Sequence, residues 1–253
     1  MAGYDAVLYR SWDEFKAGIV REFFGEGIFK RGRFLFRGHG DADWKLTSSF
    51  DRQFSHGSRE ELDTSFRRLL RDFVNEVESR DLAQLDGRDE TIVVAFAQHQ
   101  GLPTRLLDWS ESPYVAAFFA FADVIISRLL SRSVAVWAID TENPFWREDT
   151  GIRIIRPRPW RNLRLRQQEG AFTLSKMDYT SIEQYLEERG ADASALRQLL
   201  IPAGEAIRAL ADLDAMGVNF ANLFPDLEGA VREARLGLGM RQMVDSLEAM
   251  GGA

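Results

Sequence analysis

The segment from Ser112 to Ile126 constrains the fold more than any other part of the sequence. It reads SPYVAAFFAFADVII, in which Asp123 is the one charged residue. Serine followed by proline is typical of a helix start, with Ser112 as the N-cap and Pro113 in the first turn. A helix that is apolar almost all round is buried, so we expect this one in the core. It is too short to span a bilayer, which takes about 20 residues.

Strand-like alternation and helical periodicity both recur along the chain. Strands are predicted at residues 33–40, 44–50, 104–109, 133–139, 152–155, 171–174 and 196–201, and helices at 11–30, 60–78, 91–99, 112–126, 181–189, 202–216 and after Pro225. Because this order is mixed rather than a strict βα repeat, we predict an α+β fold with mixed central sheets and buried helices. One domain is expected over residues 1–235, followed by an amphipathic C-terminal tail at 236–253.

Composition excludes several classes of site. The 253 residues include no cysteine, which excludes disulfides, cysteine nucleophiles and thiolate metal sites. No pair of the three histidines has metal-ligand spacing, so no metal site is predicted. The N-terminus lacks the pattern of a signal peptide, and we expect a cytoplasmic protein without a membrane partner.

The charged residues point in two directions. The formal net charge of −7 argues against bulk electrostatic attraction to nucleic acid. However, 28 of the 32 basic residues are arginine, and a planar guanidinium can bind phosphate with two hydrogen bonds, which lysine cannot do. A local phosphate site therefore stays compatible with the acidic total.

Arg37, Gly38 and His39 form the first candidate site. They end an aromatic strand at the sequence FLFRGHG. A glycine there lets the backbone approach a ligand closely, and an arginine can bind its phosphate. The alternative is that Arg37 forms an ion pair with Asp41, Asp43 or Asp108.

The second candidate site lies between residues 98 and 109. Arg105 and Asp108 fall on opposite faces of the predicted strand, so they do not satisfy each other. Since an unpaired buried charge costs several kcal/mol, each needs another partner, and Arg37 is the expected partner of Asp108. His99 is either a satisfied core histidine or part of this site. If Arg37, His99 and Asp108 left no room for a ligand, the cluster would be structural.

An arginine-rich segment forms the third candidate site. Arginines and an aromatic residue alternate there, as is typical of nucleotide or phosphate-polymer binding, and the candidates are Arg156, Arg158, Arg161, Arg164 and Trp160. The alternative is an exposed loop whose charge is partly neutralised by neighbouring acids. The segment leads directly into Gln167-Gln168-Glu169-Gly170.

Several of these motifs resemble the bacterial FRG domain. The likeness rests on Phe36-Arg37-Gly38, on the block from Gln98 to Trp109 (QHQGLPTRLLDW) and on Ser112-Pro113, and it covers roughly residues 10–235. The resemblance implies a toxin or anti-phage effector, with a neutralising partner as a further expectation.

The order of the motifs is also similar to that of ADP-ribosyltransferases. This resemblance implies a fold of that type with NAD as cofactor. Arg37 would hold the pyrophosphate, His39 or Thr104 the nicotinamide ribose, and Glu169 the developing cation. The chain departs from the pattern by having Thr-Arg-Leu-Leu-Asp-Trp in place of Ser-Thr-Ser. If Glu169 is exposed, Asp108 is the alternative catalytic acid.

Three functions are therefore carried forward. The first is an NAD-dependent ADP-ribosyltransferase-like enzyme acting on nucleic acid or protein, with Glu169, His99 and Asp108 as catalytic candidates. Arg37, Gly38, His39, Thr104 and Arg105 would bind its cofactor. The second is a metal-independent nuclease that uses His39 or His99 as general base and two arginines as phosphate clamps. The third is a non-catalytic module that binds nucleotide or RNA through the arginine-rich segment.

Overall fold

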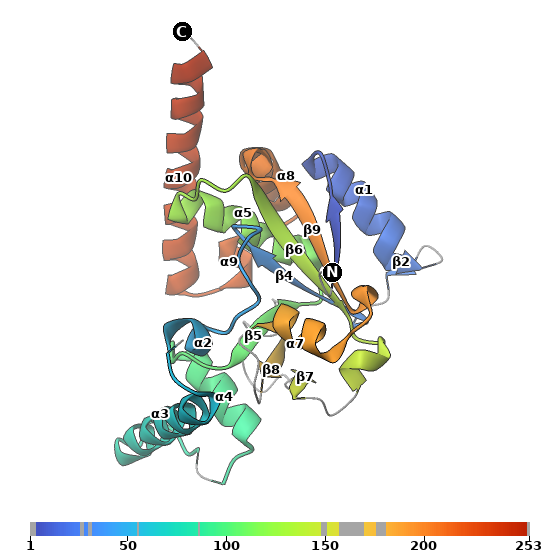
Figure 1. The fold of residues 1–253 in the computed structure, drawn as a ribbon. Helices are drawn as coiled ribbons and strands as arrows, with labels where there is room; N and C mark the ends of the chain where they lie inside the picture. The colour runs from blue at the N-terminus through green and yellow to red at the C-terminus, as the bar shows by residue number, and fades with distance from the viewer. Residues whose placement is uncertain are drawn as a thin grey trace.

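The computed structural model describes residues 4–25, 28–29, 32–54, 56–85, 87–147, 151–156, 170–175 and 181–251 (Figure 1). A seven-stranded sheet runs through the molecule in the order β1 (Asp5–Leu8), β9 (Leu196–Pro202), β6 (Ser133–Asp140), β4 (Phe34–His39), β5 (Leu106–Ser110), β8 (Gly170–Ser175) and β7 (Ile152–Ile155). β1 and β9 are parallel, and the other neighbours are antiparallel. β2 (Phe24–Gly25) and β3 (Ile28–Phe29) form a separate pair. The α+β prediction is confirmed.

Helices cover the sheet and extend from it. They are α1 (Trp12–Phe23), α2 (Ser49–Gln53), α3 (Arg59–Ser79), α4 (Glu90–His99), α5 (Pro113–Ser127), α7 (Ile182–Arg189), α8 (Ala206–Ala215), α9 (Phe220–Leu223) and α10 (Leu227–Gly251), with 3₁₀ turns at Pro144–Arg147, Ala193–Ala195 and Ala203–Glu205. Figure 1 shows α3 and α4 as a lobe at the lower left, and α10 rising along one side until it extends past the body. In the described part of the chain, no helix combines the length and the apolar character needed to cross a membrane.

The two faces of the sheet carry different cores. Alternate residues of β6 point to opposite sides: Val136 packs with α1, α5 and α8, whereas Trp137 packs with the side chains around α7. This follows from the period of two in a strand. α5 belongs to the first core, where ten of its residues are buried. Ser112 caps it by accepting a hydrogen bond from the Val115 amide, as predicted.

The predicted strand at 44–50 is wrong. The backbone after Trp44 is irregular, and α2 begins at Ser49. Two competing interactions explain the difference. The Leu46 amide donates to the carboxylate of Glu183 instead of to a strand, and Ser48 caps α2 through the Asp51 amide.

α10 crosses the predicted boundary at residue 235 as a continuous helix. Leu236 is buried, and Met240 and Met243 pack against the same core as α5. The part of α10 from Leu227 to Met243 is therefore part of the domain's packing.

Candidate functional site

A cavity of about 720 Å³ lies where β4, β5, α4, α5, α9 and α10 meet. Its size is within the range of small-molecule sites. Aromatic side chains form much of its surface, namely Phe36, Trp109, Phe119, Phe172, Phe220 and Phe224. Arg37, His99 and Asp108 all line it, so the cluster at 98–109 leaves room for a ligand.

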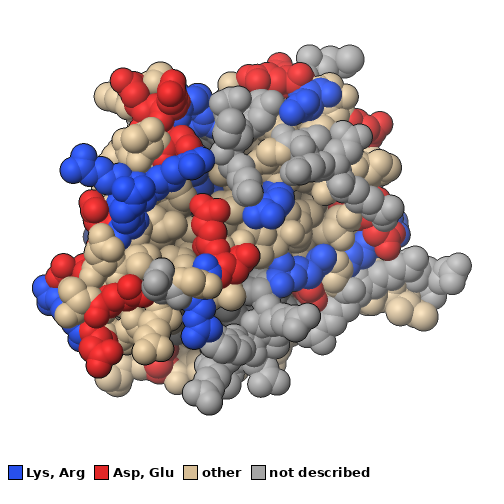
Figure 2. All heavy atoms as spheres, turned by 90° about the horizontal axis from the view of Figure 1, so that it is seen from below, with Lys and Arg blue, Asp and Glu red and all other residues tan. Residues whose placement is uncertain are grey.

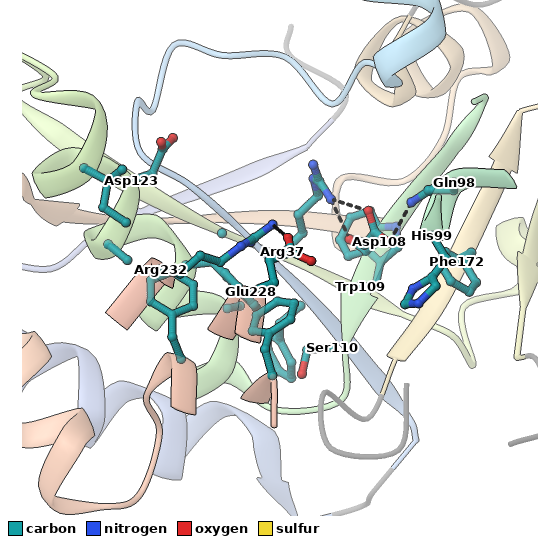
Figure 3. A pocket seen from close by; sticks show the side chains of 18 of the residues that line it. Arg37, Gln98, His99, Asp108, Trp109, Ser110, Asp123, Phe172, Glu228 and Arg232 are labelled. Carbon is teal, nitrogen blue, oxygen red and sulfur yellow. Dashed lines mark hydrogen bonds and ion pairs between the residues drawn. The ribbon is translucent and has the colours of Figure 1, made fainter. Parts of the chain in front are cut away.

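Arg37 lies at the centre of the cavity (Figure 3). Its Nη1 donates to the backbone oxygen of Asp108 at 2.8 Å, and the same atom lies 3.8 Å from the Asp108 carboxylate. Its Nε donates to Nε2 of His39 at 3.2 Å. The predicted pairing of Arg37 with Asp108 is confirmed. Within the described residues Nη2 has no hydrogen bond, so the guanidinium keeps donors for a ligand.

His39 positions Arg37 from behind and does not line the cavity. It is buried, and its Nδ1 lies 3.2 Å from the Trp44 oxygen. Burial, followed by the positive charge of Arg37, lowers the pKa of His39 to about 3, so the ring is neutral at pH 7. Because Nε2 accepts from Arg37, the proton lies on Nδ1 and is donated to Trp44. This placement contradicts direct contact of His39 with a nicotinamide ribose and its use as a general base.

Asp108 is held by a chain of hydrogen bonds from the neighbouring helix. Gln98 Nε2 donates to Asp108 Oδ1 at 2.7 Å, and the Thr104 hydroxyl donates to Gln98 Oε1 at 2.5 Å. The surrounding cavity walls desolvate the carboxylate and so raise the pKa of Asp108, although the positive charge of Arg37 opposes this shift. The side chain nevertheless keeps 63% of its surface accessible, because it faces the open cavity.

Thr104 is fully buried and does not line the cavity. Its predicted contact with a cofactor is therefore not made directly. Its hydroxyl instead fixes which end of the Gln98 amide faces Asp108, since only the NH₂ end can donate to a carboxylate.

Arg105 points away from the cavity. It is buried, and its guanidinium carbon lies 5.3 Å from the centre of the Phe50 ring and 5.4 Å from that of Phe66. It donates to Asp63 at 3.1 Å. Asp51 lies 3.8 Å from its Nε. The prediction that Arg105 binds a cofactor or clamps a phosphate is not supported, because its charge is used in the core under α2 and α3.

His99 is exposed at the end of α4 and lines the cavity. The alternative of a satisfied core histidine is thereby excluded. Its catalytic role stays a prediction.

Only the start of the arginine-rich segment lies among the described residues. Arg158, Trp160, Arg161, Arg164 and Glu169 lie outside the described residues. Arg156 donates to the Gly32 oxygen and lies 3.8 Å from Glu111. Gly170, the first described residue after Glu169, pairs with Ser110, which lines the cavity.

The opposite wall comes from the C-terminal helices. Phe220 and Phe224 face the cavity together with Glu228, Arg232 and Arg235 of α10. Figure 3 shows Gln98, His99 and Asp108 on one side of Arg37, and Glu228 and Arg232 on the other. Among the described residues, no group of three or more histidine or acidic side chains is placed to hold a metal ion.

Residues 32–127 match the family model of the FRG domain. The protein contains an FRG domain. The predicted FRG domain is confirmed for these residues, whereas the likeness to ADP-ribosyltransferases stays a prediction. The match runs from just before β4 to the end of α5, so it includes Arg37, Gln98 and Asp108 but not α9 or α10. No curated protein and no solved structure matches the chain.

The glycine of the FRG motif has a packing role that the sequence did not reveal. A Cβ at Gly38 would lie 2.9 Å from the carbonyl carbon of Ala116 and 2.9 Å from the Ala120 nitrogen, and still closer to the Ala116 oxygen. Gly38 therefore allows β4 to lie directly on the backbone of α5. Gly38 also lines the cavity, so its predicted close approach to a ligand stays a prediction beside this packing role.

Several cavity residues were missed at the level of sequence. Gln98 belongs to the FRG block, and its motif membership was the available signal. Glu228 and Arg232 have i, i+4 spacing, which indicates a helical ion pair and nothing about a cavity. Only the fold brings α10 to β4, about 190 residues earlier in the chain.

Proposed function

We propose that the FRG-domain cavity binds NAD and that the protein is an ADP-ribosyltransferase-like enzyme. The observation that carries this proposal is the convergence of Arg37, Asp108, Gln98 and His99 on one open cavity with aromatic walls. Arg37 offers free donors for a pyrophosphate, and aromatic faces suit stacking of nicotinamide or adenine.

The chemistry needs a carboxylate beside the anomeric carbon. The bond between that carbon and the nicotinamide nitrogen breaks, nicotinamide leaves with the bonding electrons, and an acceptor nucleophile forms the new bond while losing its proton. A fixed negative charge stabilises the oxocarbenium-like transition state. Asp108 is the described acid in position for this role, held by Arg37 and Gln98. Glu169 is the second candidate, since the strand that follows it pairs with the cavity residue Ser110.

His99 lines the same cavity and is exposed. It is the proposed group that accepts the proton of the acceptor. The acceptor is nucleic acid or protein, and the role of toxin or anti-phage effector with a neutralising partner follows from the resemblance to the family.

The nuclease alternative loses two of its residues, because His39 is buried behind Arg37 and Arg105 is paired in the core. The binding-module alternative stays a prediction, because residues 157–169 lie outside the described part of the chain. On the face shown in Figure 2, the described basic side chains lie in several small groups, each with acidic side chains beside it.

The test is nicotinamide release from NAD by purified protein, with RNA, DNA or lysate proteins as acceptors. Wild type is compared with Arg37→Ala, Asp108→Asn, Glu169→Gln and His99→Gln. Arg68→Gln serves as the control, because this arginine is 82% exposed on α3. Release that is lost in Arg37→Ala and in one acid variant supports the proposal and identifies the acid.

Three results would contradict it. Binding of NAD without release indicates a binding module. Cleavage of nucleic acid without NAD indicates a nuclease. If NAD is not cleaved and does not shift the melting temperature, the cavity is not an NAD site.

A further inference from the structure

We propose that α10 supplies a second anion-binding subsite to this cavity, formed by Arg232 and Arg235, and that the ligand is therefore a dinucleotide or another pyrophosphate ester and not a mononucleotide. This inference rests on the proposed function for the identity of the ligand. It goes beyond the FRG domain, because α10 lies outside the matched residues.

The three arginines of the cavity differ in their internal partners. Arg37 lies beside Asp108, and Arg232 donates to Glu228. Arg235 lines the cavity and forms no ion pair with any described residue. Asp123, the remaining acid of the lining, accepts from the Ser127 hydroxyl. Arg235 is thus the lining cation whose charge is left for a ligand.

The guanidinium of Arg232 is held in orientation by two aromatic rings. Its guanidinium carbon lies 4.8 Å from the centre of the Phe224 ring and 5.9 Å from that of Phe220. Stacking on aromatic faces restricts the orientation of the guanidinium. Glu228, Arg232 and Arg235 are spaced at i, i+4 and i+7, so they lie on one face of the helix.

The wall that carries these residues is anchored to the core. A Cβ at Gly239 would lie 2.6 Å from Ile125 Cγ2, so α10 lies against α5 at close range. Leu236 is buried one position after Arg235. At the start of the helix, a Cβ at Gly229 would overlap the carbonyl oxygen of Phe224. Close contacts on either side of Arg232 and Arg235, at Gly229 and Gly239, hold this part of α10 in place.

A ligand that spans this cavity meets cations on two sides, Arg37 on β4 and Arg232 on α10 (Figure 3). Arg235 of α10 also lines the cavity. A mononucleotide phosphate held by Arg37 leaves Arg235 without an anion, while Arg232 stays paired with Glu228. A pyrophosphate ester carries a second phosphate, which can satisfy both sides. The second subsite therefore selects for the pyrophosphate.

The experiment measures binding of ADP-ribose and of AMP by calorimetry at low salt. Arg235→Gln and Arg232→Gln are expected to weaken ADP-ribose binding about tenfold each, as expected for loss of one charged hydrogen bond, and AMP binding by much less. Arg241→Gln is the matched control, since it is an exposed arginine of the same helix outside the cavity. Glu228→Gln is expected to tighten ADP-ribose binding by removing the competing anion, a gain that a purely structural role would not produce.

The inference is overturned if both arginine variants bind ADP-ribose as tightly as wild type, or if wild type does not bind it. The two proposals can fail separately. If all α10 variants release nicotinamide and bind ADP-ribose with unchanged affinity, the subsite is refuted and the transferase proposal stands. If ADP-ribose binding depends on Arg232 and Arg235 but NAD is not turned over, the subsite stands and the transferase proposal is refuted.

Discussion

Replacing Gly38 by alanine tests how the FRG motif acts. The added Cβ would lie 2.9 Å from two backbone atoms of α5, and nearer still to the Ala116 oxygen. Comfortable carbon contacts need about 3.5–4.0 Å, so β4 and α5 would have to separate by roughly 1 Å. Both are central, since β4 pairs with β5 and β6 and α5 is buried. The expected loss is about 3 kcal/mol, the upper part of the range for overpacking, which lowers the melting temperature by about 6–12 °C in a chain of this size.

Thermal unfolding followed by circular dichroism measures this effect. Gly204→Ala is the matched control, because nothing lies within 4 Å of its added Cβ and its backbone is not left-handed. It should change stability by less than about 1 kcal/mol. If the melting temperature of Gly38→Ala lay within about 2 °C of that of Gly204→Ala, the packing explanation would be refuted. Gly38 would then owe its place in the motif to a bound ligand.

Further predictions concern the buried charges and the cavity. Arg105→Met removes one of the two arginines beside the buried carboxylate of Asp51, while Arg59 stays at 3.9 Å. The expected loss is about 2 kcal/mol, less than for a buried charge with no cation at all. Adding Asp51→Asn should restore part of this loss; urea unfolding measures both variants, and equal loss in the single and double variants would contradict the pairing. His39 has a pKa of about 3 in the fold, below its unfolded value. The unfolded chain therefore binds the proton first, and stability falls with falling pH, by about 2 kcal/mol from pH 7 to pH 5. His39→Gln should lack this component in urea titrations at both pH values, and identical pH slopes would contradict it. Thr104→Val should leave the fold intact but weaken NAD binding, because Gln98 loses its orienting donor; the reverse pattern, lower stability with normal binding, would assign Thr104 to packing alone.

Local signals in the sequence were sufficient for most helices and strands. The stripe on α3 and the Ser-Pro start of α5 each depend on residues within one or two turns, and both elements occur as predicted. The strand predicted at 44–50 failed because its decisive partner, Glu183, is more than 130 residues away. A polar contact of that kind leaves no periodic trace in the sequence.

The site was predictable in part for the same reason. Opposite faces of one strand separated Arg105 from Asp108, and the structure gives each a different partner. The sequence did not show which of the two faces points into the cavity and which points into the core. His39 and Thr104 proved to be supports of Arg37 and Gln98 because the loop at Trp44 and the turn before β5 cover them.

Both walls of the cavity pack against one element, the apolar helix α5. β4 lies on its backbone at Gly38, which positions Arg37, and α10 lies on Ile125 at Gly239, which positions Arg232 and Arg235. A glycine makes each of these contacts possible, and a side chain at either position would move one set of cations. Because α5 is one helix with ten of its fifteen residues buried, its two contact points cannot shift independently. The spacing between the cationic walls is thus set when the core folds, so a ligand meets a preorganised cavity and loses less affinity to reorganisation than it would in a flexible one.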